Sequence, residues 1–371
     1  MTPCRLILAL ILSWSCLAGC SRRTAPPTPA SAPSPAATSA ATTKTPVAEV
    51  PAKARAKADV ASQLAKAETT LAAGNLVGGV VLLDQLLQAD PDNRRALGLL
   101  AKYAQLLGQQ LPRPQNTPLL LRSAEALRRL RERKVELTPE EKVLAPVILF
   151  NEACTHAVSG EFGRAIGSLV EALDSGFLDV DQLDADHELD SLRKLPQFQD
   201  LQRKAERRKV EALLAASKPY SFDFRLTDLD GKPVALADVK GEITIVDFWG
   251  TWCLPCRKQI PHLVELARIY QEKGLRVVGL ACEPEPLEAA RKTVRAFVNS
   301  HGIHYPCLLA SDETTDKVSG FQGYPTTLFL DRAGKVRLRM TGYQSMLTLE
   351  TIVNLLLADG KPAEKGKAAT K

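Results

Sequence analysis

The sequence predicts two folded parts, an all-α domain over residues 52–217 and an α/β domain over residues 219–360. In the first part, leucines recur at helical spacing, and glycines and Asp-Pro pairs separate the successive runs. In the second part, short apolar runs alternate with helical patterns, which is typical of a central sheet covered by helices on both faces. Aromatic residues make up only 5% of the chain while alanine is abundant, which favours helices over an all-β fold.

The charge pattern argues against binding to nucleic acid. The chain has 371 residues and a formal net charge of +6. Its lysines and arginines are scattered among acids along helical segments, and no basic stripe is interleaved with aromatic residues. Such a pattern is typical of solvated helix surfaces, so we predict no nucleic-acid partner.

The N-terminus has the features of an export signal. Arg5 supplies a positive charge, and the apolar stretch over residues 6–17 is too short for a permanent membrane span. The run Leu17-Ala18-Gly19-Cys20 resembles the lipobox of bacterial lipoproteins. The resemblance implies that residues 1–19 are removed as a signal peptide and that Cys20 carries lipid, which would hold the chain at a membrane surface. The alternative is an ordinary secretory signal followed by a coincidental cysteine.

Two low-complexity segments flank the predicted domains. Residues 20–51 are rich in Pro, Ala, Ser and Thr and cannot bury enough apolar surface to fold. We predict that they form a linker with an end-to-end distance on the order of 30 Å, enough to lift a domain off the membrane. Residues 361–371 are rich in lysine and are predicted to be a disordered tail.

The α-helical domain contains a weak internal repeat. Five positions have counterparts 86 residues later: Gly74, Gly79, Leu86, Leu87 and Asp90 correspond to Gly160, Ala165, Ala172, Leu173 and Gly176. Residues 89–97 and 151–166 resemble the junctions between tetratricopeptide units, in which small residues let paired helices approach closely. The resemblance implies a tetratricopeptide-like domain that binds a protein partner. A generic helical bundle is the alternative.

The α/β domain begins with a hairpin pattern, in which residues 222–226 and 234–236 alternate around a turn. The run Ile243–Trp249 is almost continuously apolar, as expected for a strand buried on both faces. The later elements are predicted as helices over residues 255–273, 285–300 and 347–358 and as strands over residues 275–281, 324–331 and 336–340.

Cys253 and Cys256 lie where the first buried strand gives way to a helix. The helix N-terminus offers unpaired N–H groups and the positive end of the helix dipole, which stabilise a thiolate and lower the pKa of the thiol. Because the thiolate is the attacking species in disulfide exchange, we predict that Cys253 is the exposed nucleophile. Cys256 is predicted to be buried and to resolve the mixed disulfide. We predict no cofactor other than this redox-active pair.

A CxxC motif can also be half of a zinc site, but such a site needs a second pair of ligands. Cys282, Cys307 and His262 are each isolated in the sequence. We therefore predict no metal site.

Residues 246–256 read Val-Asp-Phe-Trp-Gly-Thr-Trp-Cys-Leu-Pro-Cys and resemble the active-site segment of thioredoxins. The Phe-Trp-Gly-Thr-Trp-Cys form is most similar to the membrane-tethered TlpA/ResA branch. Residues 223–232 and 323–336 resemble the N-terminal hairpin and the cis-proline segment of that branch. The resemblance covers residues 219–358 and implies a thioredoxin-like fold with thiol–disulfide oxidoreductase activity.

The resemblance also implies roles for individual residues. Pro325 would be a cis-proline facing the disulfide, and Tyr324 would pair through its backbone with an incoming peptide. Trp252 would shield one side of the disulfide. Asp247 falls where thioredoxins keep a buried acid, whose raised pKa would let it take the proton of Cys256. The alternatives are a trans-proline at a strand start and an Asp247 that is paired with a lysine.

Cys282 and Cys307 depart from the pattern of the family. Cys282 ends one predicted strand and Cys307 begins a short apolar run, so both can lie on one side of the sheet. A structural disulfide between them is the leading hypothesis. Two inert buried thiols and a second redox relay that feeds Cys253 are the alternatives.

These observations favour an exported dithiol–disulfide exchanger of the cell envelope. Its expected substrates are the disulfides of exported proteins, and a membrane electron donor or acceptor is an expected partner. A protein disulfide oxidase or isomerase and a non-catalytic partner-binding scaffold are the alternatives. A thiol peroxidase is disfavoured, because peroxiredoxins have Pro-x-x-x-Thr/Ser-x-x-Cys, whereas Gly250 and Val246 occupy those positions before Cys253.

Overall fold

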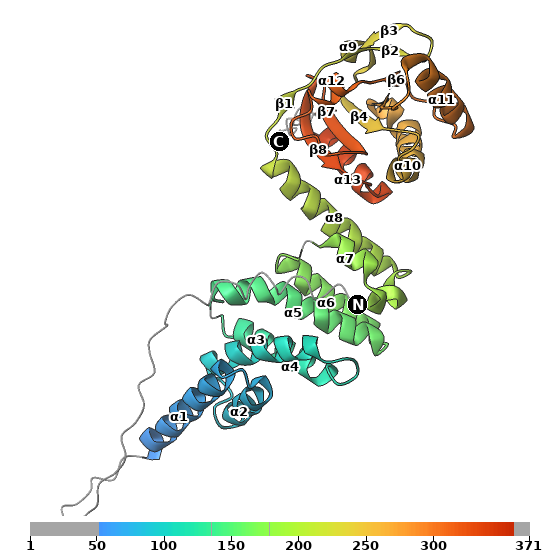
Figure 1. Ribbon diagram of the computed structural model, residues 1–371. Helices are drawn as coiled ribbons and strands as arrows, with labels where there is room; N and C mark the ends of the chain where they lie inside the picture. The colour runs from blue at the N-terminus through green and yellow to red at the C-terminus, as the bar shows by residue number, and fades with distance from the viewer. Residues whose placement is uncertain (1–51, 135, 178, 360–371) are drawn as a thin grey trace, which may run out of the picture. The chain divides into compact units, whose positions relative to one another are not determined.

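The computed structural model describes residues 52–134, 136–177 and 179–359 (Figure 1). Contacts between residues divide this part of the chain into two compact units. The helical unit contains the described residues up to Phe177 together with Asp186–Leu192, and the C-terminal unit contains residues 179–185 and 193–359. The predicted signal peptide, the lipidated Cys20, the linker and the tail lie outside the described residues.

The helical unit is all-α, as predicted (Figure 1). Its helices are α1 (Ala52–Ala72), α2 (Leu76–Ala89), α3 (Arg94–Gln110), α4 (Thr117–Glu132), α5 (Pro139–Val158), α6 (Phe162–Asp174) and the 3-10 helix η4 (His187–Leu192). Helices that follow each other in the sequence pack as pairs: α1 on α2, α3 on α4, and α5 on α6.

Local sequence signals set the boundaries of these helices. The side chain of Asn75 caps α2 by accepting a hydrogen bond from the N–H of Gly78. Thr138 and Glu141 form a reciprocal capping box at the start of α5. Gly74 follows α1 and Gly160 follows α5, both with positive φ, a conformation that favours glycine. The two glycines of the predicted repeat therefore form equivalent turns in the first and third helix pairs.

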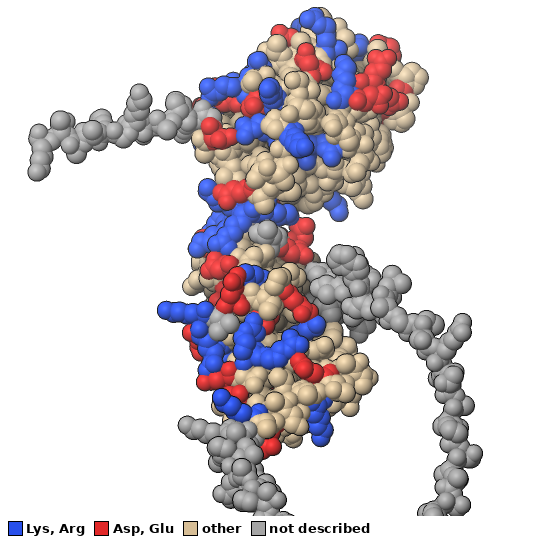
Figure 2. All heavy atoms as spheres, turned by 90° about the vertical axis from the view of Figure 1, so that its left-hand side faces the viewer, with Lys and Arg blue, Asp and Glu red and all other residues tan. Residues whose placement is uncertain are grey.

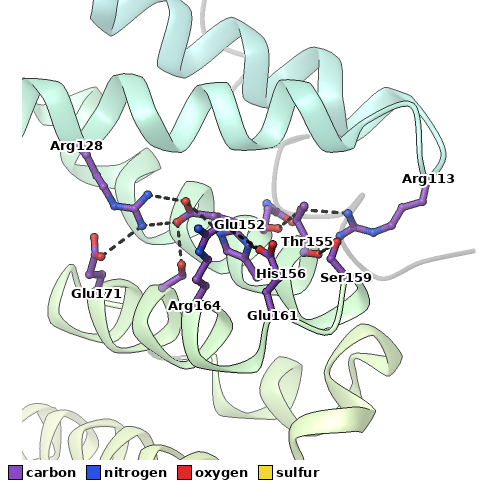
Figure 3. A network of polar contacts seen from close by, with 11 residues as sticks. Arg113, Arg128, Glu152, Thr155, His156, Ser159, Glu161, Arg164 and Glu171 are labelled. Atoms are coloured by element: carbon purple, nitrogen blue, oxygen red, sulfur yellow. Dashed lines mark hydrogen bonds and ion pairs between the residues drawn. The ribbon is translucent and has the colours of Figure 1, made fainter.

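A buried carboxylate joins α5 to its two neighbours (Figure 3). Glu152 of α5 is 3% exposed and accepts hydrogen bonds of 2.5 Å from both terminal nitrogens of Arg128 on α4. Ser168 Oγ on α6 donates a third hydrogen bond to it at 2.9 Å. The bidentate guanidinium compensates the buried charge, so this carboxylate is part of the packing of the three helices.

The C-terminal unit is an α/β domain. Its elements are α7 (Val180–Ala185), α8 (Pro196–Ala216), β1 (Tyr220–Ser221), β2 (Arg225–Asp228), β3 (Pro233–Ala235), α9 (Leu236–Val239), β4 (Ile243–Trp249), α10 (Leu254–Tyr270), η5 (Gln271–Lys273), β5 (Leu275–Ala281), α11 (Leu287–Ser300), β6 (Cys307–Leu309), α12 (Asp312–Thr315), β7 (Thr326–Asp331), β8 (Lys335–Thr341) and α13 (Met346–Asp359).

The strands form one mixed sheet in the order β1-β8-β7-β4-β5-β6-β2-β3. All seven residues of β4 are buried, as the apolar run predicted. β4 pairs in parallel with β5 and antiparallel with β7, so Asp247 lies opposite Gly279 on one side and Thr327 on the other. The predicted thioredoxin-like fold of this part of the chain is confirmed.

Successive side chains of β4 point to opposite faces of the sheet and fill two cores. Ile245 and Trp249 pack in one core together with Cys256 of α10. Val246 and Phe248 pack in the other core. Asp247 lies between Ile245 and Trp249 in the sequence and therefore faces the side of the sheet that α10 covers.

Helix α8 belongs to the C-terminal unit, although the sequence pattern placed the domain boundary after residue 217. α8 packs on α13, and its Val210 is buried in the same core as Leu349, Ile352 and Val353 of α13. The change in sequence pattern at Pro219 marks the start of the strands. The boundary between the two compact units lies earlier in the chain, before α8.

Charges of both signs are interspersed on the face of the helical unit that Figure 2 shows. Ion pairs join different helices of this unit, such as Lys102 with Glu140 and Arg122 with Asp84. This is the arrangement that the sequence pattern predicted for solvated helix surfaces. Within the described residues, none of the helices combines the length and the apolar character that crossing a membrane requires.

Candidate active site

Cys253 and Cys256 form a disulfide at the start of α10, directly after β4. Their Cα atoms are 5.3 Å apart. Cys253 is the N-cap residue of α10, and its Sγ accepts a hydrogen bond of 3.2 Å from the N–H of Cys256. Pro255 lies in the first turn, where its missing N–H costs no hydrogen bond. The fold thus holds Cys253 at the positive end of the helix dipole, where a thiolate is stabilised.

The predicted exposure of Cys253 is wrong for the disulfide form. Cys253 is 4% exposed and Cys256 is fully buried. The sulfur of Cys253 turns back toward its own helix, where it bonds to Cys256 and meets the N–H of that residue. The exposed surface beside the disulfide is instead apolar, because Trp252 and Leu254 are 55% and 63% exposed.

The peptide bond between Tyr324 and Pro325 is cis, as the resemblance implied. The ring of Tyr324 lies edge-on to Trp252, with ring centroids 5.3 Å apart, and packs in the same manner against Phe321. The carbonyl of Pro325 accepts a hydrogen bond of 2.8 Å from the N–H of Gly342. The contact between Tyr324 and Trp252 brings the cis-proline segment next to the residue that precedes Cys253.

Asp247 is fully buried, and its partners among the described residues are neutral. Its Oδ1 accepts hydrogen bonds from Thr327 Oγ1 at 2.8 Å and from Gln259 Nε2 at 3.1 Å. Its Oδ2 has no hydrogen-bond partner in the described part of the chain. Burial raises the pKa of Asp247 to about 7, although the two hydrogen bonds act to lower it. The alternative of an ion pair with lysine is wrong, because β4 carries this side chain into the core.

Gln259, which the sequence pattern did not single out, completes the surroundings of Asp247. Gln259 lies three residues after Cys256, on the same side of α10, and is fully buried. Its Nε2 also donates to Thr327 Oγ1 at 2.9 Å, and its Oε1 accepts from the N–H of Gln344 at 2.8 Å. An amide at a helical position that shares a face with apolar residues was the signal that could have identified it.

Glu283 anchors the segment that precedes the two cysteines. Its two carboxylate oxygens accept hydrogen bonds of 2.7 and 2.9 Å from the N–H and the hydroxyl of Thr251. Burial raises its pKa. Trp252 Nε1 donates to the carbonyl of Cys282 at 3.1 Å. These contacts fasten residues 251 and 252 to the end of β5.

A cleft of about 560 Å³ opens beside Trp252 and Tyr324. Its apolar wall includes Leu287, Ala290 and Leu309, and its carboxylates are Glu283, Glu285 and Asp312. The residues that line it, all within the described part of the chain, include no lysine, arginine or histidine. The cleft therefore combines apolar surface with carboxylate groups next to Trp252, the residue that precedes Cys253.

Cys282 and Cys307 do not form the predicted disulfide. Cys307 lies opposite Gly279 in the pairing of β5 with β6 and packs in the core that contains Trp249. Cys282 packs against the core on the other face of the sheet. Burial raises the pKa of Cys282 to about 11 and that of Cys307 to about 12, so both remain thiols at neutral pH.

Among the described residues, the group of possible metal ligands is Cys154, Asp186 and Glu188, whose ligand atoms lie within 4.8 Å of one another. Arg113 donates to both carboxylate oxygens of Glu188, at 2.7 and 2.6 Å. A guanidinium in this position already neutralises the carboxylate, which disfavours a cation here. The absence of a metal site stays a prediction.

Comparisons with known proteins match the C-terminal unit. The model of the AhpC/TSA family matches residues 221–339. The thiol-disulfide oxidoreductase ResA of Bacillus anthracis is 34% identical over 128 residues, which cover 34% of this chain and 71% of that relative. ResA of Bacillus subtilis (strain 168) is 29% identical over 142 residues, which cover 38% of this chain and 74% of that relative.

A solved structure from Chlorobium tepidum TLS, described as a thiol:disulfide interchange protein of the thioredoxin family, is 30% identical. The match covers 38% of this chain and 98% of that one, with a TM-score of 0.34. The identity to the ResA proteins carries the assignment, since it reaches 34% across 71% of the relative's length. The chain thus belongs to the ResA family of thiol–disulfide oxidoreductases.

Proposed function

We propose that this chain reduces disulfides of exported proteins in the cell envelope, with Cys253 and Cys256 as the redox pair. The observation that carries the proposal is the disulfide at the N-terminus of α10. Trp252, the residue before Cys253, contacts Tyr324, whose peptide bond to Pro325 is cis. The relatives named thiol-disulfide oxidoreductase ResA support thiol–disulfide exchange as the reaction.

The proposed reaction has two exchange steps. The thiolate of Cys253 attacks one sulfur of a substrate disulfide, and the other substrate sulfur leaves as a thiolate. The thiolate of Cys256 then attacks the sulfur of Cys253, and the second substrate sulfur leaves. Two electrons pass to the substrate, and the enzyme is left with the Cys253–Cys256 disulfide. Asp247 is proposed to accept the proton of the Cys256 thiol, because its raised pKa suits a general base near neutral pH.

The cleft beside the disulfide is the proposed site for the substrate chain. Tyr324 would offer its backbone to an extended peptide, and Trp252 and Leu287 would pack against that peptide. Glu283, Glu285 and Asp312 would favour peptides with lysine or arginine near the reacting cysteine, because opposite charges attract across a partly desolvated surface. The proposed substrate is therefore a cationic, partly apolar segment that contains a disulfide.

The proposed location is the outer side of a membrane, with lipid on Cys20 and residues 20–51 as the tether. A membrane electron donor would re-reduce the disulfide after each turnover. Replacing Cys20 with alanine tests the anchor. The variant is expected to move from the membrane fraction to the soluble extracytoplasmic fraction, and unchanged membrane association would contradict lipid attachment at this residue.

The helical unit is proposed to select the protein partner, in the manner of tetratricopeptide-like repeats. The pairwise packing of α1 to α6 and the equivalent glycine turns after α1 and α5 support this interpretation. Deleting the helical unit while keeping α8 is expected to leave the reduction of a generic disulfide unchanged and to abolish partner-specific capture.

The decisive experiment measures the reduction potential of the Cys253–Cys256 pair and traps its substrates. We expect a potential near that of thioredoxin, about −270 mV, whereas a value near −120 mV would make the chain a dedicated oxidant. The variant Cys256→Ser is expected to accumulate mixed disulfides through Cys253. The matched variant Cys253→Ser is expected to trap none. Equal trapping by both variants would contradict the assignment of Cys253 as the nucleophile.

A further inference from the structure

We infer that Gln259 is a positioning residue of the redox centre, which orients Asp247 so that its Oδ2 is the oxygen that exchanges the proton with Cys256. This inference rests on the proposed function and concerns how the same site moves a proton. Gln259 touches neither the cysteines nor a substrate in any contact that the structure shows, so its effect is exerted through Asp247.

The orientation of the Gln259 amide follows from its partners. A backbone N–H can only donate, so the side-chain atom that meets the N–H of Gln344 at 2.8 Å is the oxygen Oε1. The nitrogen Nε2 must then point the other way, toward Asp247 and Thr327. The peptide N–H of Gln344 therefore prevents the amide from rotating to place its oxygen against the carboxylate.

Both hydrogens of Nε2 are used in a closed triangle of hydrogen bonds. One donates to Asp247 Oδ1 at 3.1 Å and the other to Thr327 Oγ1 at 2.9 Å. Thr327 in turn donates its single hydroxyl hydrogen to Asp247 Oδ1 at 2.8 Å. Oδ1 thus receives two donors, which leaves Oδ2 as the oxygen on which a proton can be taken up.

The free oxygen Oδ2 lies in a fully buried environment on the face of the sheet that α10 covers. Cys256 lies on the same side of α10 as Gln259, three residues earlier, and packs in the core of that face. An unpartnered carboxylate oxygen at such a place is costly unless a proton is shared with it. The exchange with Cys256 supplies that proton.

Other polar groups around Asp247 come from the neighbouring strands. A side chain at Gly279, opposite Asp247 on β5, would meet Trp249 Nε1, Cys307 and Tyr305, so these three groups surround that position. The charge of Asp247 helps to raise the pKa of Tyr305, Cys307 and, at the end of β5, Cys282. Tyr305, Cys307 and Cys282 are neutral near pH 7, so none of them sets the protonation of Asp247 through a charge of its own. The hydrogen bond from Gln259 therefore keeps its influence on that carboxyl.

The step balances in atoms and electrons. In the mixed disulfide, the Cys256 thiol gives its proton to Asp247 Oδ2 and becomes a thiolate. Its electron pair forms the bond to the Cys253 sulfur, the bond between Cys253 and the substrate sulfur breaks, and the substrate leaves as a thiolate. Asp247 is then a neutral acid, and it returns the proton to the Cys256 thiolate that forms when the electron donor next reduces the Cys253–Cys256 disulfide.

The test measures how fast the full chain releases a substrate thiol from a pre-formed mixed disulfide at Cys253, by rapid mixing from pH 5 to pH 9. The wild-type midpoint is expected near the pKa of Asp247, about 7. The variant Gln259→Leu removes a donor to the carboxylate, so the midpoint is expected to rise by about one pH unit, which is a tenfold shift in the proton equilibrium.

Two further variants separate positioning from packing. Ile260→Val alters a buried neighbour on α10 that has no polar contact with Asp247, so it is expected to lower the melting temperature and leave the midpoint in place. Gln259→Glu keeps the shape but puts a second carboxyl beside Asp247, so the profile is expected to split into two steps. This second variant keeps the test open if Gln259→Leu fails to fold.

The outcomes separate this inference from the proposed function. A midpoint in Gln259→Leu that equals the wild-type midpoint, with a lowered melting temperature like that of Ile260→Val, would reduce Gln259 to a packing residue. A wild-type chain that shows no reversible dithiol couple would overturn the proposed function instead.

Discussion

Glu152 of the helical unit and Asp247 of the C-terminal unit are both buried carboxylates, and they differ in whether a cation faces them. Glu152 in the helical unit faces a bidentate Arg128 and a serine hydroxyl, so both of its oxygens are satisfied by donors (Figure 3). Asp247 in the C-terminal unit meets only neutral donors, and one of its oxygens has no partner among the described residues. Removing one partner of a buried ion pair destabilises a fold, whereas a buried carboxyl without a cation can gain and lose a proton near neutral pH.

The largest effect that this comparison predicts is the pH dependence of the free energy of unfolding of the oxidised chain. Asp247 has a folded pKa of about 7 against an ordinary value of 3.8, so the native state binds this proton more tightly than the unfolded state. The contribution of Asp247 to the free energy of unfolding is fully present below about pH 4 and is lost as the pH rises to about 7. The loss amounts to about 4 kcal/mol of unfolding free energy.

The comparison variant for this prediction is Asp247→Asn, which keeps the size of the side chain and removes the titration. Trp249 and Trp252 are the tryptophans in the described residues, and both lie in the C-terminal unit. Denaturant unfolding followed by tryptophan fluorescence at pH 4 and pH 8 therefore reports this unit. If wild type and variant lost the same free energy between the two pH values, Asp247 would not titrate in this range.

The second test breaks the pair in the helical unit. Arg128→Leu leaves Glu152 buried without its cation, which is expected to destabilise the helical unit by about 3 kcal/mol. The matched control is Arg164→Leu, because Arg164 is 72% exposed in its ion pair with Glu161 and is expected to contribute less than about 1 kcal/mol. Circular dichroism measures the helical transition, and the reduction potential should be the same in both variants.

The third and smallest test concerns the negative charge of the cleft. Glu285→Lys is expected to raise the KM for a lysine-rich disulfide peptide by roughly threefold at low salt and to lower it for an acidic one. Both effects should shrink in high salt, since the charge is close to solvent. A KM that changes in the same direction for both peptides would indicate a steric effect instead.

The sequence was informative where a pattern is local. The apolar run of β4, the CxxC at the start of α10 and the proline after Tyr324 occupy the predicted places, because strand burial, helix capping and X–Pro geometry are all set by near neighbours. The same patterns predicted the boundaries of β5 and α13 to within about one or two residues.

The features that were missed depend on pairings between distant segments. Cys282 ends one apolar run and Cys307 begins another, but the register of β5 with β6 puts them on opposite faces of the sheet. Gln259 gains its role from a loop 85 residues later, whose Gln344 fixes the amide. Periodicity gives the face of a helix or strand but does not identify the partner that the face will meet.

The packing of α8 on α13 has a practical consequence for how this protein can be shortened. A fragment that starts at Pro219 would remove Val210 and Leu214 from the core that they share with α13 and leave that apolar surface open to water. Such a fragment is expected to aggregate through this surface and to precipitate during purification. A fragment that starts before α8 would keep the surface covered, so residues 193–359 are expected to stay in solution and to let the redox chemistry be studied by itself.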